Sequence, residues 1–197
     1  MAGQRSRMDG ESRREALLDV GAALFAQRSY DEVEIGDIAA ATGVSRGLLY
    51  HYFRDKADYF LAVMARRLDV LADASRVAPG GSRLATLRSG LDAYLDFIAA
   101  NPQWYRSIYR SAISADAAVH DLLEDAHARQ AEQILALFPE LERSPLRTVA
   151  VRGWVLLLAR AGMSWLDGAD VDREALRDRC LDVLAAALGV PTLEDEG

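Results

Sequence analysis

Apolar residues recur three and four positions apart along almost the whole chain. No run of alternating apolar and polar residues is bounded by turn residues, as a β-strand would be. The pattern therefore predicts an all-α protein of about nine helices. We expect these helices at residues 12–28, 35–42, 46–53, 56–76, 83–100, 102–114, 116–137, 145–167 and 172–188.

Glycine, proline and capping residues indicate where these helices begin and end. Ser12 and Glu15 have the spacing of a capping box, which predicts the start of the first helix near Ser12. The strongest break is Pro79-Gly80-Gly81. We expect two domains, at residues 11–71 and 72–197, joined by the long fourth helix.

The two short helices around Gly43 carry the pattern of a helix-turn-helix at about residues 34–53. Gly43 supplies the positive φ that the turn needs, and small or apolar residues hold the second helix at a steep angle to the first. Counted from Ile35, these residues fall at positions 4, 5, 9, 10, 15 and 18: Ile38, Ala39, Gly43, Val44, Leu49 and Tyr52. On spacing alone, an ordinary helical hairpin remains the alternative.

The second of these helices is expected to present a polar face to solvent. With Ser45 as its N-cap, that face carries Arg46, Gly47, Leu48, Tyr50 and His51. Arginine suits a bidentate contact to guanine, tyrosine and histidine can reach phosphate oxygens, and glycine permits close approach. Lys56, at the start of the next helix, is placed to bind a further phosphate. The face predicts binding to double-stranded DNA.

A block of residues in this region closely resembles the DNA-binding domain of the TetR (tetracycline-repressor-like) family, over roughly residues 12–60. The block comprises Leu24-Phe25, Tyr30, Asp37-Ile38-Ala39, Gly43-Val44-Ser45, Gly47, Leu49-Tyr50, Tyr52-Phe53 and Lys56. The resemblance implies a homodimeric, ligand-responsive repressor whose two recognition helices enter successive major grooves of a palindromic operator. It also implies DNA contacts by Thr42, Ser45, Arg46, Gly47, Tyr50, His51 and Lys56.

Two positions depart from the family pattern. Ser29 stands where the family usually has glycine, and Glu34 stands where it usually has threonine or serine at the start of the second helix. A carboxylate there repels a phosphate instead of donating to it. An arm carrying Arg5, Arg7, Arg13 and Arg14 is a candidate to compensate, and a solvated tail is the alternative.

The net charge of −7 is unusual for a nucleic-acid-binding protein, so the local distribution matters. Residues 1–14 carry four arginines against two acidic residues, and residues 42–56 carry three basic residues against one. The single cysteine, Cys180, excludes an internal disulfide, and no secretory signal begins the sequence, so we expect a cytoplasmic protein. The apolar run 149–166 contains Arg152 and Arg160, which would each cost about 2.5 kcal/mol at mid-bilayer. We therefore expect a buried helix and no membrane contact.

The C-terminal half is expected to bind a second copy and a small effector. Apolar residues on the last two helices suggest half of a four-helix dimer interface, with a monomeric core as the alternative. The interface candidates are Leu156, Met163, Leu181, Leu184 and Leu188. Aromatic residues suggest a pocket for a lipophilic small molecule, with core packing as the alternative. The pocket candidates are Tyr94, Phe97, Trp104, Tyr105, Tyr109 and Trp154.

Two alternatives belong to other classes of protein. His120, Glu124 and His127 share one helical face near Asp116 and could hold a transition metal, although we expect a solvated polar face and no metal. The second alternative is a helical dimer that binds protein instead of DNA, and salt dependence distinguishes the two. Cys180 lacks an adjacent base and is assigned to packing. We recognise no catalytic arrangement and expect no cofactor.

Overall fold

The chain folds into helices throughout the part that the structure, a computed structural model, describes: residues 10–76, 82–110 and 117–193. Within these ranges there are nine helices and no strand, which confirms the predicted fold class. The helices are α1 (Gly10–Phe25), α2 (Ile35–Thr42), α3 (Arg46–Tyr52), α4 (Lys56–Ala74), α5 (Arg83–Ala100), α6 (Pro102–Arg110), α7 (Ala117–Ala136), α8 (Pro145–Leu166) and α9 (Arg173–Leu188).

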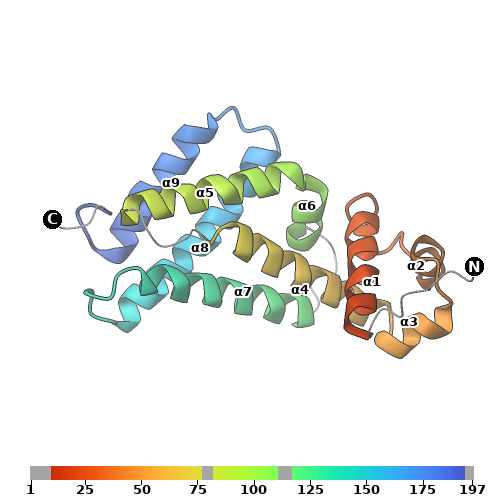
Figure 1. The fold of residues 1–197 in the computed structure, drawn as a ribbon. Coiled ribbons are helices and arrows are strands. Elements are labelled where there is room, and N and C mark those ends of the chain that lie inside the picture. The colour runs from red at the N-terminus through yellow and green to blue at the C-terminus, as the bar shows by residue number, and fades with distance from the viewer. Residues whose placement is uncertain (1–9, 77–81, 111–116, 194–197) are drawn as a thin grey trace, which may run out of the picture.

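The helices form a smaller and a larger unit (Figure 1). We call α1–α3 the N-terminal unit and α5–α9 the C-terminal unit. Helix α4 contacts both, because it packs on α1 at one end and on α5 and α7 at the other. The predicted linker Pro79-Gly80-Gly81 lies outside the described residues.

Aromatic side chains fix the N-terminal unit to the start of α4. Phe25 of α1 packs edge-on against Phe60 of α4 at 4.9 Å between ring centroids, and Phe53 packs against Tyr59 at 4.8 Å. The Tyr59 hydroxyl donates to the Leu17 carbonyl across 2.5 Å. This approach requires glycine at position 21, because a Cβ there would lie 2.6 Å from Val63 Cγ2 and would also collide with the Tyr59 ring.

Short polar side chains begin most of the helices. Ser45, Ser82 and Ser144 each accept a hydrogen bond from a backbone N–H of the first turn, at α3, α5 and α8 respectively. The expected capping box at Ser12 is wrong, because α1 already begins at Gly10 and Ser12 lies inside it. Glu11 in the first turn favours this earlier start through its interaction with the helix dipole.

Helix α8 runs through the C-terminal unit and packs against α5, α6, α7 and α9. It is the one helix of the described residues whose length and apolarity would suffice to cross a membrane. Its inward side is buried at Val151, Val155 and Leu158, and the Trp154 indole donates to the Cys180 carbonyl of α9 across 2.8 Å. These contacts are those of a core helix in a folded domain.

Arg67 joins α4 to the corner between α5 and α6. Its guanidinium donates to the Asn101 side-chain oxygen and lies 5.4 Å from the Phe97 ring centroid and 5.5 Å from that of Trp104. Partial burial lowers the pKa of Arg67 from its usual value. The contact ties the far half of α4 to the C-terminal unit through charge and aromatic surface together.

Candidate DNA-binding surface and aromatic core

The turn between α2 and α3 is set by a left-handed glycine. Gly43 has φ 67° and ψ 22°, and its N–H donates to the Ala40 carbonyl. The next N–H, that of Val44, donates back to Ala39 across 3.1 Å, so α2 ends in a Schellman motif. This geometry aims the chain from α2 into α3 in the way that the spacing around Gly43 predicts.

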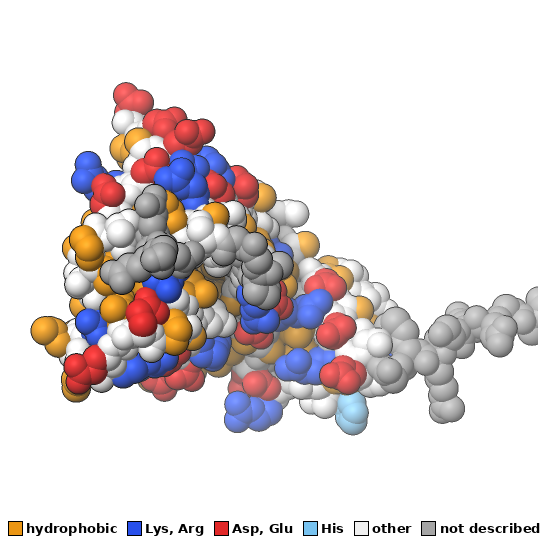
Figure 2. Space-filling view, turned by 60° about the vertical axis from the view of Figure 1, so that its left-hand side comes forward, with side chains coloured by type: hydrophobic (Ala, Val, Ile, Leu, Met, Phe, Trp, Pro, Cys, Tyr) orange, Lys and Arg blue, Asp and Glu red, His pale blue; other side chains and the backbone are white. Residues whose placement is uncertain are grey.

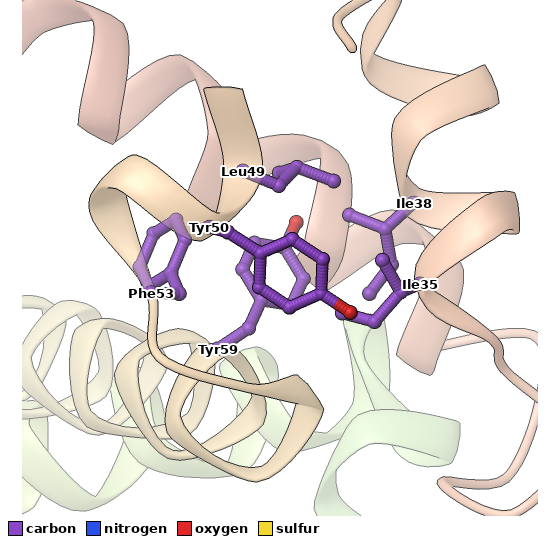
Figure 3. Close-up of a pocket in the computed structure, with 6 residues that line it drawn as sticks. All are labelled: Ile35, Ile38, Leu49, Tyr50, Phe53 and Tyr59. Carbon is purple, nitrogen blue, oxygen red and sulfur yellow. The ribbon is translucent and has the colours of Figure 1, made fainter. Parts of the chain in front are cut away.

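Apolar contacts hold α3 against α2 and α4 (Figure 3). Ile38, Leu49, Phe53 and Tyr59 are buried between these helices. Tyr50 lies on the outer side of this cluster, with its ring turned toward Ile35. The cluster leaves no cavity large enough for a water molecule, so α3 is fixed in orientation by close packing.

The residues expected to touch DNA share one exposed surface at the start of α3. We call this surface, made of Ser45, Arg46, Gly47, Tyr50 and His51, the recognition face; all five residues are exposed. Leu48 of the same helix is half-buried. The Ser45 hydroxyl oxygen accepts from the Leu48 N–H across 3.2 Å, which fixes where the face begins.

Two other expected DNA contacts are partly occupied within the chain. The Thr42 hydroxyl donates to the Ile38 carbonyl across 2.6 Å. The Lys56 ammonium donates to the Tyr30 carbonyl across 3.2 Å and lies 4.3 Å from the centroid of the Tyr30 ring. An ammonium has three donors, so Lys56 keeps capacity for a phosphate while it ties α4 to the loop before α2.

The start of α2 is acidic, and arginines lie beside it. The Glu34 N–H donates to the Asp37 carboxylate across 3.0 Å, and Arg28 pairs with the same carboxylate at 2.9 Å. The N–H of Glu34, and then Arg28, lower the pKa of Asp37.

The Arg46 guanidinium lies over Gly36, where a Cβ would be 2.6 Å from Nη2. Sequence reasoning missed Gly36, although a glycine inside a helix is costly and is itself a signal.

Positive and negative side chains are interspersed over the face of the molecule seen in Figure 2, and neither sign covers it alone. Of the arginines considered for an N-terminal arm, Arg5 and Arg7 lie outside the described residues. Arg13 and Arg14 belong to α1, and the Arg14 guanidinium lies 5.3 Å from the Phe53 ring centroid. These two are therefore part of the folded N-terminal unit.

In the C-terminal unit, five of the six expected pocket residues form one contacting group. We call Tyr94, Phe97, Trp104, Tyr105 and Tyr109 the aromatic cluster. Phe97 packs edge-on against Trp104 at 5.7 Å, and the Tyr105 and Tyr109 rings are 4.9 Å apart. Tyr105 bonds the Tyr94 hydroxyl and donates to the Ala159 carbonyl of α8 across 3.1 Å. Burial raises the pKa of all three tyrosines.

Trp154, the sixth expected pocket residue, serves the α8–α9 contact instead and pairs with no ring of the cluster in the described part of the chain. Two buried nitrogens beside the cluster have no hydrogen-bond partner among the described residues: Trp104 Nε1 and His127 Nδ1. The cluster thus combines apolar surface with polar atoms that a ligand could satisfy. A separate open depression of about 370 Å³ lies between α5 and α9, beside Arg88 and Asp178.

Most of the expected dimer-interface residues are buried inside their own chain. Four of the five predicted interface residues fill the core between α8, α9 and their neighbours: Met163, Leu181, Leu184 and Leu188. Leu156 differs, since 48% of it is exposed, and Leu157 beside it is 43% exposed. With Leu146, Val149 and Gly153, these two form an exposed apolar surface along α8 that we call the α8 face.

The metal-binding alternative finds no support from the positions of its residues. His127 is buried and its Nε2 bonds the Tyr109 hydroxyl across 2.9 Å, whereas His120 and Glu124 are exposed. Asp116 lies outside the described residues, and the described residues contain no group of three metal-ligating side chains. Cys180 is buried, and burial raises the pKa of its thiol, which fits its assignment to packing.

Comparison with known proteins identifies both units. Residues 17–63 match the family described as bacterial regulatory proteins, tetR family, and residues 84–187 match the tetracyclin repressor-like, C-terminal domain. A crystal structure of a tetR-family transcriptional regulator from Streptomyces coelicolor is 31% identical, with a TM-score of 0.78 over 92% of this chain and 84% of that one.

Two further proteins extend the comparison. The HTH-type transcriptional activator FasR of Mycolicibacterium smegmatis is 28% identical over 90% of this chain and 81% of its own length. A putative transcriptional regulator from Saccharomonospora viridis, solved in complex with choline, shares the fold at a TM-score of 0.68 and 18% identity over 87% of this chain and 95% of its own. Proteins of this family are transcriptional regulators and not enzymes. The chain therefore belongs to the TetR family of DNA-binding transcriptional regulators.

Proposed function

We propose that this chain is a homodimeric, ligand-responsive repressor that binds a palindromic operator and is released by a small lipophilic effector. The observation that carries the proposal is the recognition face, which the Gly43 turn and the Ser45 cap hold exposed at the start of α3. In a helix-turn-helix, the first residues of the second helix meet base edges while the first helix crosses the DNA backbone. Residues 11–71 would form the DNA-binding domain and residues 72–197 the effector and dimerisation domain.

The α8 face supports the homodimer. Leucine and valine side chains exposed side by side on one helix favour burial against a second apolar surface. A twofold axis through this face would let the same residues of both copies meet, and the two recognition faces would then be related by that axis. Half-sites about 34–36 Å apart would place both faces in successive major grooves.

The aromatic cluster supports an effector site. Its rings offer apolar surface, and Trp104 Nε1 and His127 Nδ1 are buried polar atoms without a partner in the described part of the chain. An apolar molecule with one or two polar groups would satisfy both features. Because Arg67 contacts Phe97 and Trp104, a ligand that displaces these rings would move α4 and the N-terminal unit.

A selection of genomic DNA by the purified protein tests the proposal. We expect an enriched imperfect palindrome, bound by a dimer, with an affinity that falls steeply as salt rises. Addition of lipophilic compounds to the bound fragment identifies effectors, and transcription from that fragment distinguishes repression from activation. A protein that enriches no sequence, and whose binding to DNA does not change with salt, would instead be a protein-interaction module. We propose that it acts in the cytoplasm, where its operator lies.

A further inference from the structure

The side chain of Arg46 lies against α2, although Arg46 begins α3. A Cβ built on Gly36 would be 2.6 Å from Arg46 Nη2, 3.5 Å from its Cζ and 3.7 Å from its Nε. All three atoms belong to the guanidinium, so the whole charged group rests on the space that a side chain at position 36 would fill. Gly36 is half-buried.

The Arg46 guanidinium also keeps its capacity to bind a ligand. Arg46 is exposed overall, and within the described ranges no carboxylate lies within 4 Å of it. The nearby Asp37 carboxylate is already occupied by Arg28 and by the Glu34 N–H. The group is therefore a solvent-facing cation with five donors, and it occupies the space that Gly36 leaves open on α2.

The position of this cation decides which part of DNA it meets. In a helix-turn-helix the first helix crosses the sugar-phosphate backbone, and the first residues of the second helix meet the base edges. A guanidinium that rests on α2 lies on the side where the backbone passes. The first turn of α2 offers Glu34 and Asp37 there, and neither carboxylate can bind a phosphate.

We infer that Arg46 binds a backbone phosphate beside α2, and that Gly36 is the positioning residue, because its lack of a side chain leaves room for the guanidinium there. The inference rests on the proposed function, since it assigns one contact within the same DNA complex. It moves Arg46 from base recognition to backbone binding and leaves base contact to the rest of the recognition face. Sequence preference is then independent of Arg46.

Three variants test the inference on two duplexes: the fragment selected by the wild-type protein and a scrambled duplex of equal length and composition. We expect Arg46→Ala to weaken binding to both duplexes by the same factor. Loss of one phosphate contact should also make binding less sensitive to salt. The wild-type protein's advantage in affinity over the variant should therefore be about threefold smaller at 200 mM salt than at 50 mM. Gly36→Ala should weaken binding in the same uniform way, and the double variant should bind no more weakly than Arg46→Ala alone.

Arg54→Ala provides a matched control, because Arg54 is an exposed arginine of the neighbouring loop, 3.6 Å from Asp58. The fold-losses in DNA affinity from Gly36→Ala and Arg54→Ala should multiply in the double variant, because the two sites are independent. Those from Gly36→Ala and Arg46→Ala should not multiply, because both changes remove the same contact. Gly36→Ala should unfold at the same or a higher temperature, since alanine favours the helix. Loss of affinity at particular base pairs in Arg46→Ala, or a double variant weaker than Arg46→Ala, would overturn the inference. If the wild-type protein enriches no DNA, it is the proposed function that fails.

Discussion

Tyr50 of the N-terminal unit and Tyr105 of the C-terminal unit show how differently the two units use the same side chain. Tyr50 is 52% exposed on a helix fixed by the turn before it, whereas Tyr105 is buried and bonds both Tyr94 and α8. In the N-terminal unit the candidate functional side chains lie on the surface and take no part in the packing of the core. In the C-terminal unit the candidate effector residues are the core, so binding there has to exchange one set of contacts for another.

The largest expected effect is a loss of folding stability on α8 and α9. It distinguishes residues buried in the core of the chain from residues on the exposed α8 face, which we propose contact a second copy. Leu184→Ala should lower the free energy of unfolding by about 3 kcal/mol, because it empties a fully buried site. Leu156→Ala should leave the subunit folded and weaken its self-association, because Leu156 is half exposed. Urea unfolding and sedimentation over a concentration series measure the two effects. Equal losses of folding stability in the two variants would show that this division is wrong.

A somewhat smaller effect is expected where α1 meets α4. Gly21→Ala should cost about 2 kcal/mol, because the new methyl group would overlap Val63 and the Tyr59 ring in a closely packed interface. Gly153→Ala is the control, since a Cβ there meets nothing within 4 Å and alanine favours the helix. Thermal unfolding of both variants provides the test, and a Gly21→Ala protein as stable as wild type would mean that the N-terminal unit is less rigid than its packing indicates.

The two tyrosines give a direct comparison of the units. Tyr105→Phe should cost about 1 kcal/mol of stability, because it removes bonds to Tyr94 and to the Ala159 carbonyl. Tyr50→Phe should change stability by less than about 0.5 kcal/mol and should instead weaken DNA binding. Chemical unfolding and DNA titration on the same two samples separate the effects. A Tyr50→Phe protein with reduced stability and intact DNA binding would reverse the comparison.

The smallest effect is a pH dependence confined to the C-terminal unit. Burial lowers the pKa of His127 from 6.5, so the folded protein resists protonation that the unfolded chain accepts. Stability should therefore fall with a shallow slope as pH drops below about 6.5. His127→Gln should flatten that slope, whereas replacement of the exposed His120 on the same helix should leave it unchanged. Unfolding curves between pH 5 and 7 (about the range in which histidine titrates) measure it.

Local signals explain why the N-terminal unit could be predicted so closely from the sequence. Gly43 and Ser45 each determine the backbone within a few residues of themselves, and the exposed side of a capped seven-residue helix then follows from its period. The resting place of Arg46 could not be predicted in this way, because it depends on the missing side chain of Gly36 on another helix.

The C-terminal unit could be predicted only as far as its helices. A leucine stripe has the same spacing whether it meets its own chain or a second copy, so Leu184 and Leu156 look alike in the sequence. The same holds for aromatic residues: Trp104 joins the aromatic cluster and Trp154 does not, and the difference arises from how α8 is rotated against α5 and α9. Such rotations are set by the packing of the whole unit.

Helix α4 is anchored at two points, by Lys56 at its first residue to the Tyr30 carbonyl and by Arg67 farther along to Asn101 and two aromatic rings. The anchors are eleven positions apart along the helix, which makes the segment between them a rigid arm about 16 Å long. For such an arm, each degree of tilt about Arg67 carries Lys56 through about 0.3 Å. A tilt of about five degrees would then move the Lys56 ammonium by about half the length of a hydrogen bond. A slight rearrangement of the rings around Arg67 is therefore enough to break a contact between Lys56 and a DNA phosphate.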